Sequence, residues 1–153
     1  PPAGVVGCAD SRVPPEVVFD QGLGDVFVVR TAGNVVDDVA LGSIEFAVAS
    51  RGARLIVVLG HERCGAVEAT LAGQPVPGHI QAVIDAVRPN ISPAARDGRQ
   101  LDAAIDDNVD AIAARLRTAE PILAPRVRDG SLRVVGAVYD LDSGAVRLVD
   151  AQG

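Results

Sequence analysis

The sequence contains no tryptophan and no methionine, and it has only one tyrosine and three phenylalanines among 153 residues. A hydrophobic core must therefore be built from Val, Ile, Leu and Ala, and the hydrophobic fraction of 48% is sufficient for this. The length predicts a single domain over residues 1–153. Because even position 1 is not methionine, we expect a processed product or a piece of a longer protein.

Basic residues and long apolar runs are also scarce. Lys and Arg number 14 against 20 Asp and Glu, so the formal net charge is −6, which argues against a nucleic-acid partner. No apolar run approaches the roughly 18 residues that a membrane-spanning helix needs. No signal-peptide pattern opens the chain. We therefore expect a cytoplasmic location, or the cytosolic face of a membrane-protein fusion, with no membrane insertion by this chain.

Cysteine is rare as well, and two cysteines cannot stabilise a domain of this size through disulfides. Cys8 begins the polar motif CADSR, which also contains Asp10, and Cys64 closes the motif HERC, which begins with His61. Two thiolates, an imidazole and a carboxylate form a ligand set that is suited to zinc. The rare residues therefore point to a Zn²⁺ cofactor, provided that the fold brings the two motifs together.

Short β-rich runs alternate with helical periodicity along the chain. This alternation predicts an α/β fold with a mostly parallel β-sheet of four to five strands and helices on both faces. A short polar turn over residues 140–144 predicts that the last strand is antiparallel to the strand before it. The expected strands are 4–7, 25–30, 55–60, 133–139 and 145–149, and the expected helices are 37–52, 80–87 and 101–116.

This architecture predicts where the two motifs lie. Cys8 follows the first expected strand and His61 follows the third. Ligands of open α/β sheets bind beyond the carboxyl ends of the strands, so the motifs converge if these two strands are neighbours. Cys64 follows His61 by one helical turn, which allows both side chains to face the same ion.

Each motif alone has an ordinary interpretation. A buried cysteine is often simply a small hydrophobic residue, and an Asp and an Arg two positions apart often form a surface ion pair of little energetic weight. Both cysteines of the chain nevertheless lie at strand ends, which favours zinc. Two alternatives to an enzyme stay open: a non-catalytic zinc-binding interaction or regulatory domain of a larger protein, and a thiol-redox or structural protein without metal.

Four motifs in sequence order, CADSRVP (8–14), VVRTAGN (28–34), GSIEFA (42–47) and GHERCGA (60–66), resemble those of the β-class carbonic anhydrases. The resemblance is detailed over residues 4–71 and continues more weakly over 134–139. It implies a lyase that reversibly hydrates CO2 to bicarbonate and a proton, with zinc as cofactor. It also implies a homodimer or a dimer of dimers. The family's usual N-terminal helices have no counterpart in this sequence, as expected for a domain taken from a larger protein.

The resemblance also implies roles for individual residues. Zinc would be held by Cys8, His61 and Cys64, and Asp10 would be a further ligand only in a closed form of the site. Asp10 and Arg12 would form the catalytic pair. The positions that match the family's CO2 pocket, partly across the dimer interface, are Phe27, Ala32 and Phe46. Gly65 is expected in the same pocket, and because a helix opens there its backbone N–H groups favour a nearby anion.

Overall fold

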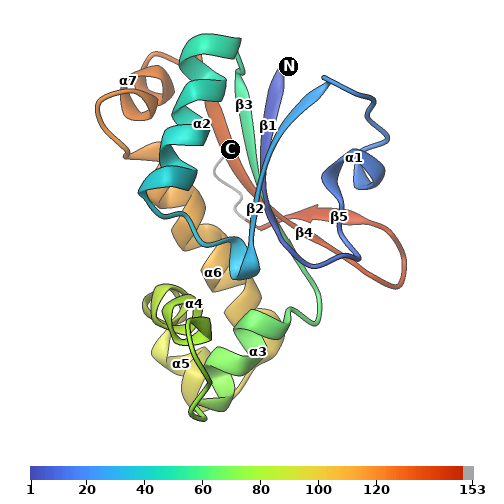
Figure 1. Cartoon of the computed structure of the whole chain (residues 1–153), viewed down its shortest axis with the longest axis vertical. Coiled ribbons are helices and arrows are strands. Elements are labelled where there is room, and N and C mark those ends of the chain that lie inside the picture. Colours follow the sequence, from blue (N-terminus) through green and yellow to red (C-terminus); the bar gives the residue numbers. More distant parts are fainter. Residues whose placement is uncertain (150–153) are drawn as a thin grey trace.

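The computed structural model describes residues 1–149 and shows a five-stranded β-sheet with helices packed against it (Figure 1). The strands are β1 (Ala3–Cys8), β2 (Val26–Thr31), β3 (Leu55–His61), β4 (Arg133–Tyr139) and β5 (Val146–Leu148). The α-helices are α1 (Pro15–Val18), α2 (Asp38–Arg51), α3 (Gly65–Ala72), α4 (Ile80–Val87), α5 (Pro93–Asp97), α6 (Leu101–Arg117) and α7 (Leu123–Arg128). Two 3₁₀ turns, η1 (Ala32–Asn34) and η2 (Arg88–Asn90), complete the set.

The strand order is β2-β1-β3-β4-β5, with every pair parallel except β4 and β5. This confirms the predicted α/β fold, its mostly parallel sheet and its antiparallel last strand. β1 lies between β2 and β3, and its register pairs Gly7 with Leu59. Because neighbouring parallel strands end at the same edge, the condition for convergence of the two motifs is met. The predicted single domain extends to residue 153, and residues 150–153 lie outside the described part.

The two faces of the sheet are covered unequally. On one face α2 and α6 pack over the main core, and the buried face of α6 repeats at spacings of three and four through Ile105, Val109 and Ile112. On the other face a smaller cluster centred on Val5 packs against the short helix α1 and Phe19. Helices therefore flank both faces, as predicted, but the second face carries much less helix among residues 1–149.

Two glycines allow α6 to approach the sheet closely next to the end of β3. A Cβ atom added to Gly60 would lie 2.5 Å from the Val109 Cγ2 atom, and one added to Gly136 would lie 2.9 Å from Val109 Cγ1. Both distances are shorter than real Cβ contacts, so larger residues would push the helix away. Gly60 directly precedes His61, and the close approach therefore fixes the backbone from which that histidine projects.

The structure contains short helices that the sequence did not predict. The helix expected over 80–87 is confirmed as α4, whereas α1, α5 and α7 were not predicted because four to six residues are too few to show a helical period. Proline at the first helical position of α1 and α5 marks their starts. No helix among the described residues is both long and apolar enough to cross a membrane.

Candidate metal centre

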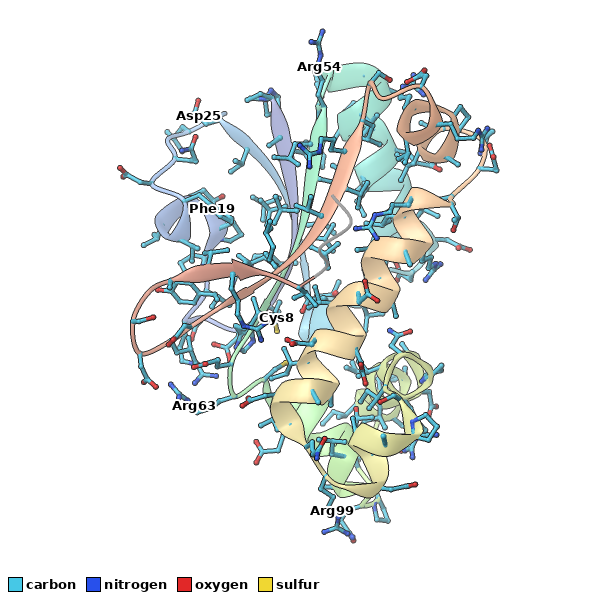
Figure 2. The ribbon with its side chains drawn as sticks, turned by 180° about the vertical axis from the view of Figure 1, so that it is seen from behind. Cys8, Phe19, Asp25, Arg54, Arg63 and Arg99 are labelled. Carbon is cyan, nitrogen blue, oxygen red and sulfur yellow. The ribbon has the colours of Figure 1, made fainter. Side chains whose placement is uncertain are left out.

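Cys8, His61 and Cys64 meet at the carboxyl ends of β1 and β3. Cys8 is the last residue of β1, His61 is the last residue of β3, and Cys64 caps the start of α3. One ligand atom from each lies within 4.8 Å of the other two. All three residues are buried, and both cysteines are free thiols. Figure 2 shows Cys8 and Arg63 toward one end of the sheet, with Arg54 at the other.

The histidine is oriented so that one ring nitrogen faces the sulfurs. His61 Nδ1 lies 2.7 Å from the Glu62 carbonyl oxygen, which can only accept, so Nδ1 carries the proton and Nε2 keeps its lone pair. Among the described residues, His61 Nε2 is a buried side-chain nitrogen that has no hydrogen-bond partner. Buried polar atoms without partners are rare in native proteins. A lone pair aimed at two thiols fits a bound metal cation.

The two thiols shift each other's pKa in opposite directions, which prepares the site for a cation. The Cys64 thiol donates a hydrogen bond that lowers the pKa of Cys8 to about 4, against the opposing effect of burial. The same hydrogen bond, reinforced by burial, raises the pKa of Cys64. Burial lowers the pKa of His61, but the nearby Cys8 sulfur and the Glu62 carbonyl outweigh burial and leave that pKa raised. A metal ion would replace these protons, since thiolate and neutral imidazole are the ligating forms.

Asp10 and Arg12 form a tightly bonded pair beside the three ligands. Arg12 donates from Nε to Asp10 Oδ1 over 2.9 Å and from Nη2 to Asp10 Oδ2 over 2.6 Å, and its backbone N–H also donates to Oδ1 over 2.9 Å. These bonds hold the pKa of Asp10 well below its usual range. Asp10 Oδ2 lies 3.8 Å from His61 Nε2, so the carboxylate borders the metal centre while it is bonded to the guanidinium.

Arg12 and Arg63 connect the two motifs and anchor the second one. Arg12 Nη2 donates to the Arg63 carbonyl oxygen over 3.2 Å, which links the loop after β1 to the loop after β3. Arg63 has a left-handed backbone with φ of 50° and forms an ion pair with Asp142 in the β4–β5 turn. The Glu62 N–H donates to the Tyr139 carbonyl oxygen over 3.1 Å. The β4–β5 hairpin therefore supports the loop that carries His61 and Cys64.

The turn after β2 completes the support of Cys8. Asn34 is buried, and its Nδ2 donates to the carbonyl oxygens of Val6 and Leu59 over 3.0 and 2.8 Å, which ties β1 to β3. Gly33 has φ of 66°, and a Cβ there would lie 2.9 Å from Val87 Cγ2. Sequence reasoning missed the role of Asn34. Its signal was a polar residue within a motif that directly follows a strand.

The four predicted pocket residues fall into two groups within one chain. Ala32 and Gly65 line a mostly apolar pocket of about 260 Å³, together with Ala66, Ala69, Ile80, Val83 and Ile84. Phe27 and Phe46 instead pack against each other with ring centroids 6.5 Å apart, and Phe46 is 47% exposed. The structure thus separates the aromatic pair from the pocket. A pocket shared across two chains stays a prediction.

Comparison with known proteins agrees with this geometry. A family profile described as carbonic anhydrase matches residues 3–146. Carbonic anhydrase 2 of Mycobacterium tuberculosis is 46% identical over 158 residues, which cover 100% of this chain and 76% of that protein. The β-carbonic anhydrase of Coccomyxa, solved in complex with acetazolamide, has 31% identity and a TM-score of 0.85, covering 97% of this chain and 71% of that chain.

The tetrameric β-carbonic anhydrases of the ascomycete Sordaria macrospora have the same fold, with a TM-score of 0.84 at 24% identity, covering 97% of this chain and 80% of that chain. The family match spans most of the described residues and includes every element that surrounds the metal centre. The chain therefore belongs to the carbonic anhydrase family of lyases, and within it to the β class.

Proposed function

We propose that the chain catalyses the reversible, zinc-dependent hydration of CO2 to bicarbonate and a proton. The observation that carries this proposal is the buried group of Cys8, His61 and Cys64, in which the unpartnered His61 Nε2 faces the two sulfurs. The bonded pair of Asp10 and Arg12 beside it favours an enzyme, since a purely structural metal site has no use for such a pair. Membership of the family supports the same reaction.

Zinc is the metal that best suits these residues. Two thiolates and one imidazole are typical zinc ligands, and three protein ligands are the usual number in catalytic zinc sites. The sulfurs of Cys8 and Cys64 and Nε2 of His61 would hold the ion. When bound, zinc would lower the pKa of water and so supply hydroxide near neutral pH.

Asp10 would orient the attacking water rather than store its proton. Its pKa is held far below neutrality by Arg12, so the carboxylate is a poor base but a good hydrogen-bond acceptor. A hydrogen bond from the water to Asp10 Oδ2 would turn an oxygen lone pair toward the carbon of CO2. The new bond joins the water oxygen to carbon, one C=O electron pair moves onto oxygen, and a proton leaves to the solvent.

The substrate pocket would be completed by a second copy of the chain, as a homodimer or a dimer of dimers. β2 is an edge strand of the described sheet, and such edges readily pair with another chain. Phe46 and Val39 are exposed on α2, which contacts β2, and Leu23 is exposed just before that strand. Burial of these side chains against a second copy would bring the aromatic pair of one chain toward the other.

The proposed location is the cytoplasm, where thiols stay reduced.

The decisive experiment measures CO2 hydration by stopped-flow on the zinc-loaded protein, with the Cys64→Ser variant as control and metal content determined for both. We expect one zinc per chain and rapid hydration in the parent, and neither in the variant. Stoichiometric zinc without hydration would instead indicate the non-catalytic zinc domain. A metal-free protein with a Cys8–Cys64 disulfide would overturn the metal assignment.

A further inference from the structure

Arg30 crosses from β2 to the end of β1 and binds the backbone there. Its Nε donates to the Cys8 carbonyl oxygen over 2.8 Å, and its Nη2 donates to the Asp10 carbonyl oxygen over 2.5 Å. Arg30 pairs with Gly7 in the parallel register. A Cβ at Gly7 would lie 3.6 Å from the Arg30 Cγ atom, so the aliphatic part of the arginine passes directly beside this glycine.

The two carbonyl groups belong to the residues at either end of a three-residue segment. Cys8 carries a candidate metal-binding thiol, and Asp10 carries the carboxylate that is bonded to Arg12. The sheet ends within this segment, where the Ala9 N–H still donates to Thr31 but the chain then leaves β1. Backbone carbonyls in such a place need partners. The Asp10 carbonyl also accepts from the Val13 N–H over 3.3 Å, and the guanidinium adds two donors from one rigid group.

We propose that Arg30 is a positioning residue that fixes the direction in which the chain leaves β1, so that the Asp10 carboxylate stays on Arg12 beside the metal centre. The proposal rests on the proposed function and adds a residue that touches neither substrate nor metal. A guanidinium can hold two carbonyl oxygens at a set spacing, whereas a lysine ammonium is a single point donor on a flexible chain. The planar shape of the side chain, and not only its charge, is therefore required.

This role has a specific kinetic signature. Loss of the two bonds leaves the sulfurs and His61 Nε2 in place, so metal binding should persist. Arg30 is not among the residues that line the pocket of Ala32 and Gly65, so KM should change little. Orientation of Asp10 would suffer, and displacements of about 1 Å can reduce turnover by about 100-fold. The expected effect is therefore on kcat.

The test compares Arg30→Gln and Arg30→Lys with Arg54→Gln. Arg54 is an exposed arginine at the opposite end of the sheet, which makes it a matched control (Figure 2). Each protein is loaded with zinc for kinetics and with Co²⁺ for absorption spectroscopy between pH 7 and 9. Metal content and thermal unfolding are measured on the same samples.

We expect both Arg30 variants to bind one metal ion, to lose about tenfold or more in kcat with KM within about twofold, and to show an altered cobalt spectrum. Arg54→Gln should match the parent. A lower thermal midpoint with parental kcat and a parental cobalt spectrum would mean a merely structural role and would overturn the proposal. If Arg30→Gln does not fold, Arg30→Lys decides by the same criteria. Absence of hydration in the parent would defeat the proposed function, while the cobalt spectra would still test Arg30.

Discussion

Two regions of the molecule differ in how much of the proposed site a single chain can form. They are the carboxyl ends of β1 and β3 and the edge strand β2. At the strand ends, Cys8, His61 and Cys64 are buried and already face one another. On β2, Phe27 is level with Gly4 while Thr31 is level with Cys8, so Phe27 lies four residues, or about 13 Å, from the metal centre along the strand. The three candidate ligands meet within one chain, whereas in the proposed function the aromatic residues would reach a pocket only through a second chain.

The strongest test of this comparison removes a metal ligand. We expect His61→Ala to lose stoichiometric metal and to lower CO2 hydration by at least about 100-fold, since the metal supplies the nucleophile. Metal content by mass spectrometry and stopped-flow hydration check this. An active, metal-free His61→Ala protein would show that the buried group is not the catalytic centre.

The second largest loss of activity is expected from Arg12→Ala. The variant should keep its metal and lose about 10- to 100-fold in kcat, because Asp10 is no longer held. Arg12 lowers the pKa of Asp10, so its removal lets that pKa rise toward the ordinary value of about 4. Asp10 then still stays ionised above about pH 6, and the loss should be the same from pH 7 to pH 9. A loss confined to the lower end of that range would mean that Arg12 acts through charge.

Truncation of Phe46, the exposed aromatic residue on α2, should act through self-association of the chain. Phe46→Ala should keep its metal but weaken self-association by about tenfold or more, since exposed aromatic residues often dominate such interfaces. Activity per chain should then fall on dilution, which sedimentation velocity and concentration-dependent kinetics can follow. The matched control is Ala114→Ser, an exposed position on α6. Concentration-independent activity equal to the parent would place the pocket wholly within one chain.

The smallest effect is expected for Asp142→Asn, which removes the ion pair with Arg63. Both side chains are exposed, and such pairs contribute little, so activity should stay within about twofold of the parent. Stopped-flow assays at low and at high salt check this. A large loss of activity at low salt would mean that the ion pair between Arg63 and Asp142 holds the His61 loop more strongly than the exposure of the two side chains suggests.

The sequence predicted the fold and the grouping of the candidate ligands because both depend on local patterns. Strand ends are visible where an apolar run stops, and parallel neighbours bring such ends together, which explains why Cys8 and His61 were placed correctly. The contacts of Arg30 and Asn34 with carbonyl oxygens could not be predicted in the same way. They depend on the register between β1 and its neighbours, and a single sequence does not determine register. The separation of Phe27 from Ala32 has a different origin, because five residues along and just past one strand keep them apart.

The order of these elements along the chain also affects biosynthesis. All three candidate ligands lie within the first 64 residues, whereas α6 and β4, which cover and extend the sheet beside β3, come later. At synthesis rates of about 5–20 residues per second, the roughly 50 residues between Cys64 and the end of α6 take on the order of 3–10 s to appear. During that interval the complete fold does not yet enclose the two thiols. Binding of the proposed zinc would therefore compete with oxidation of the thiols before the chain is finished.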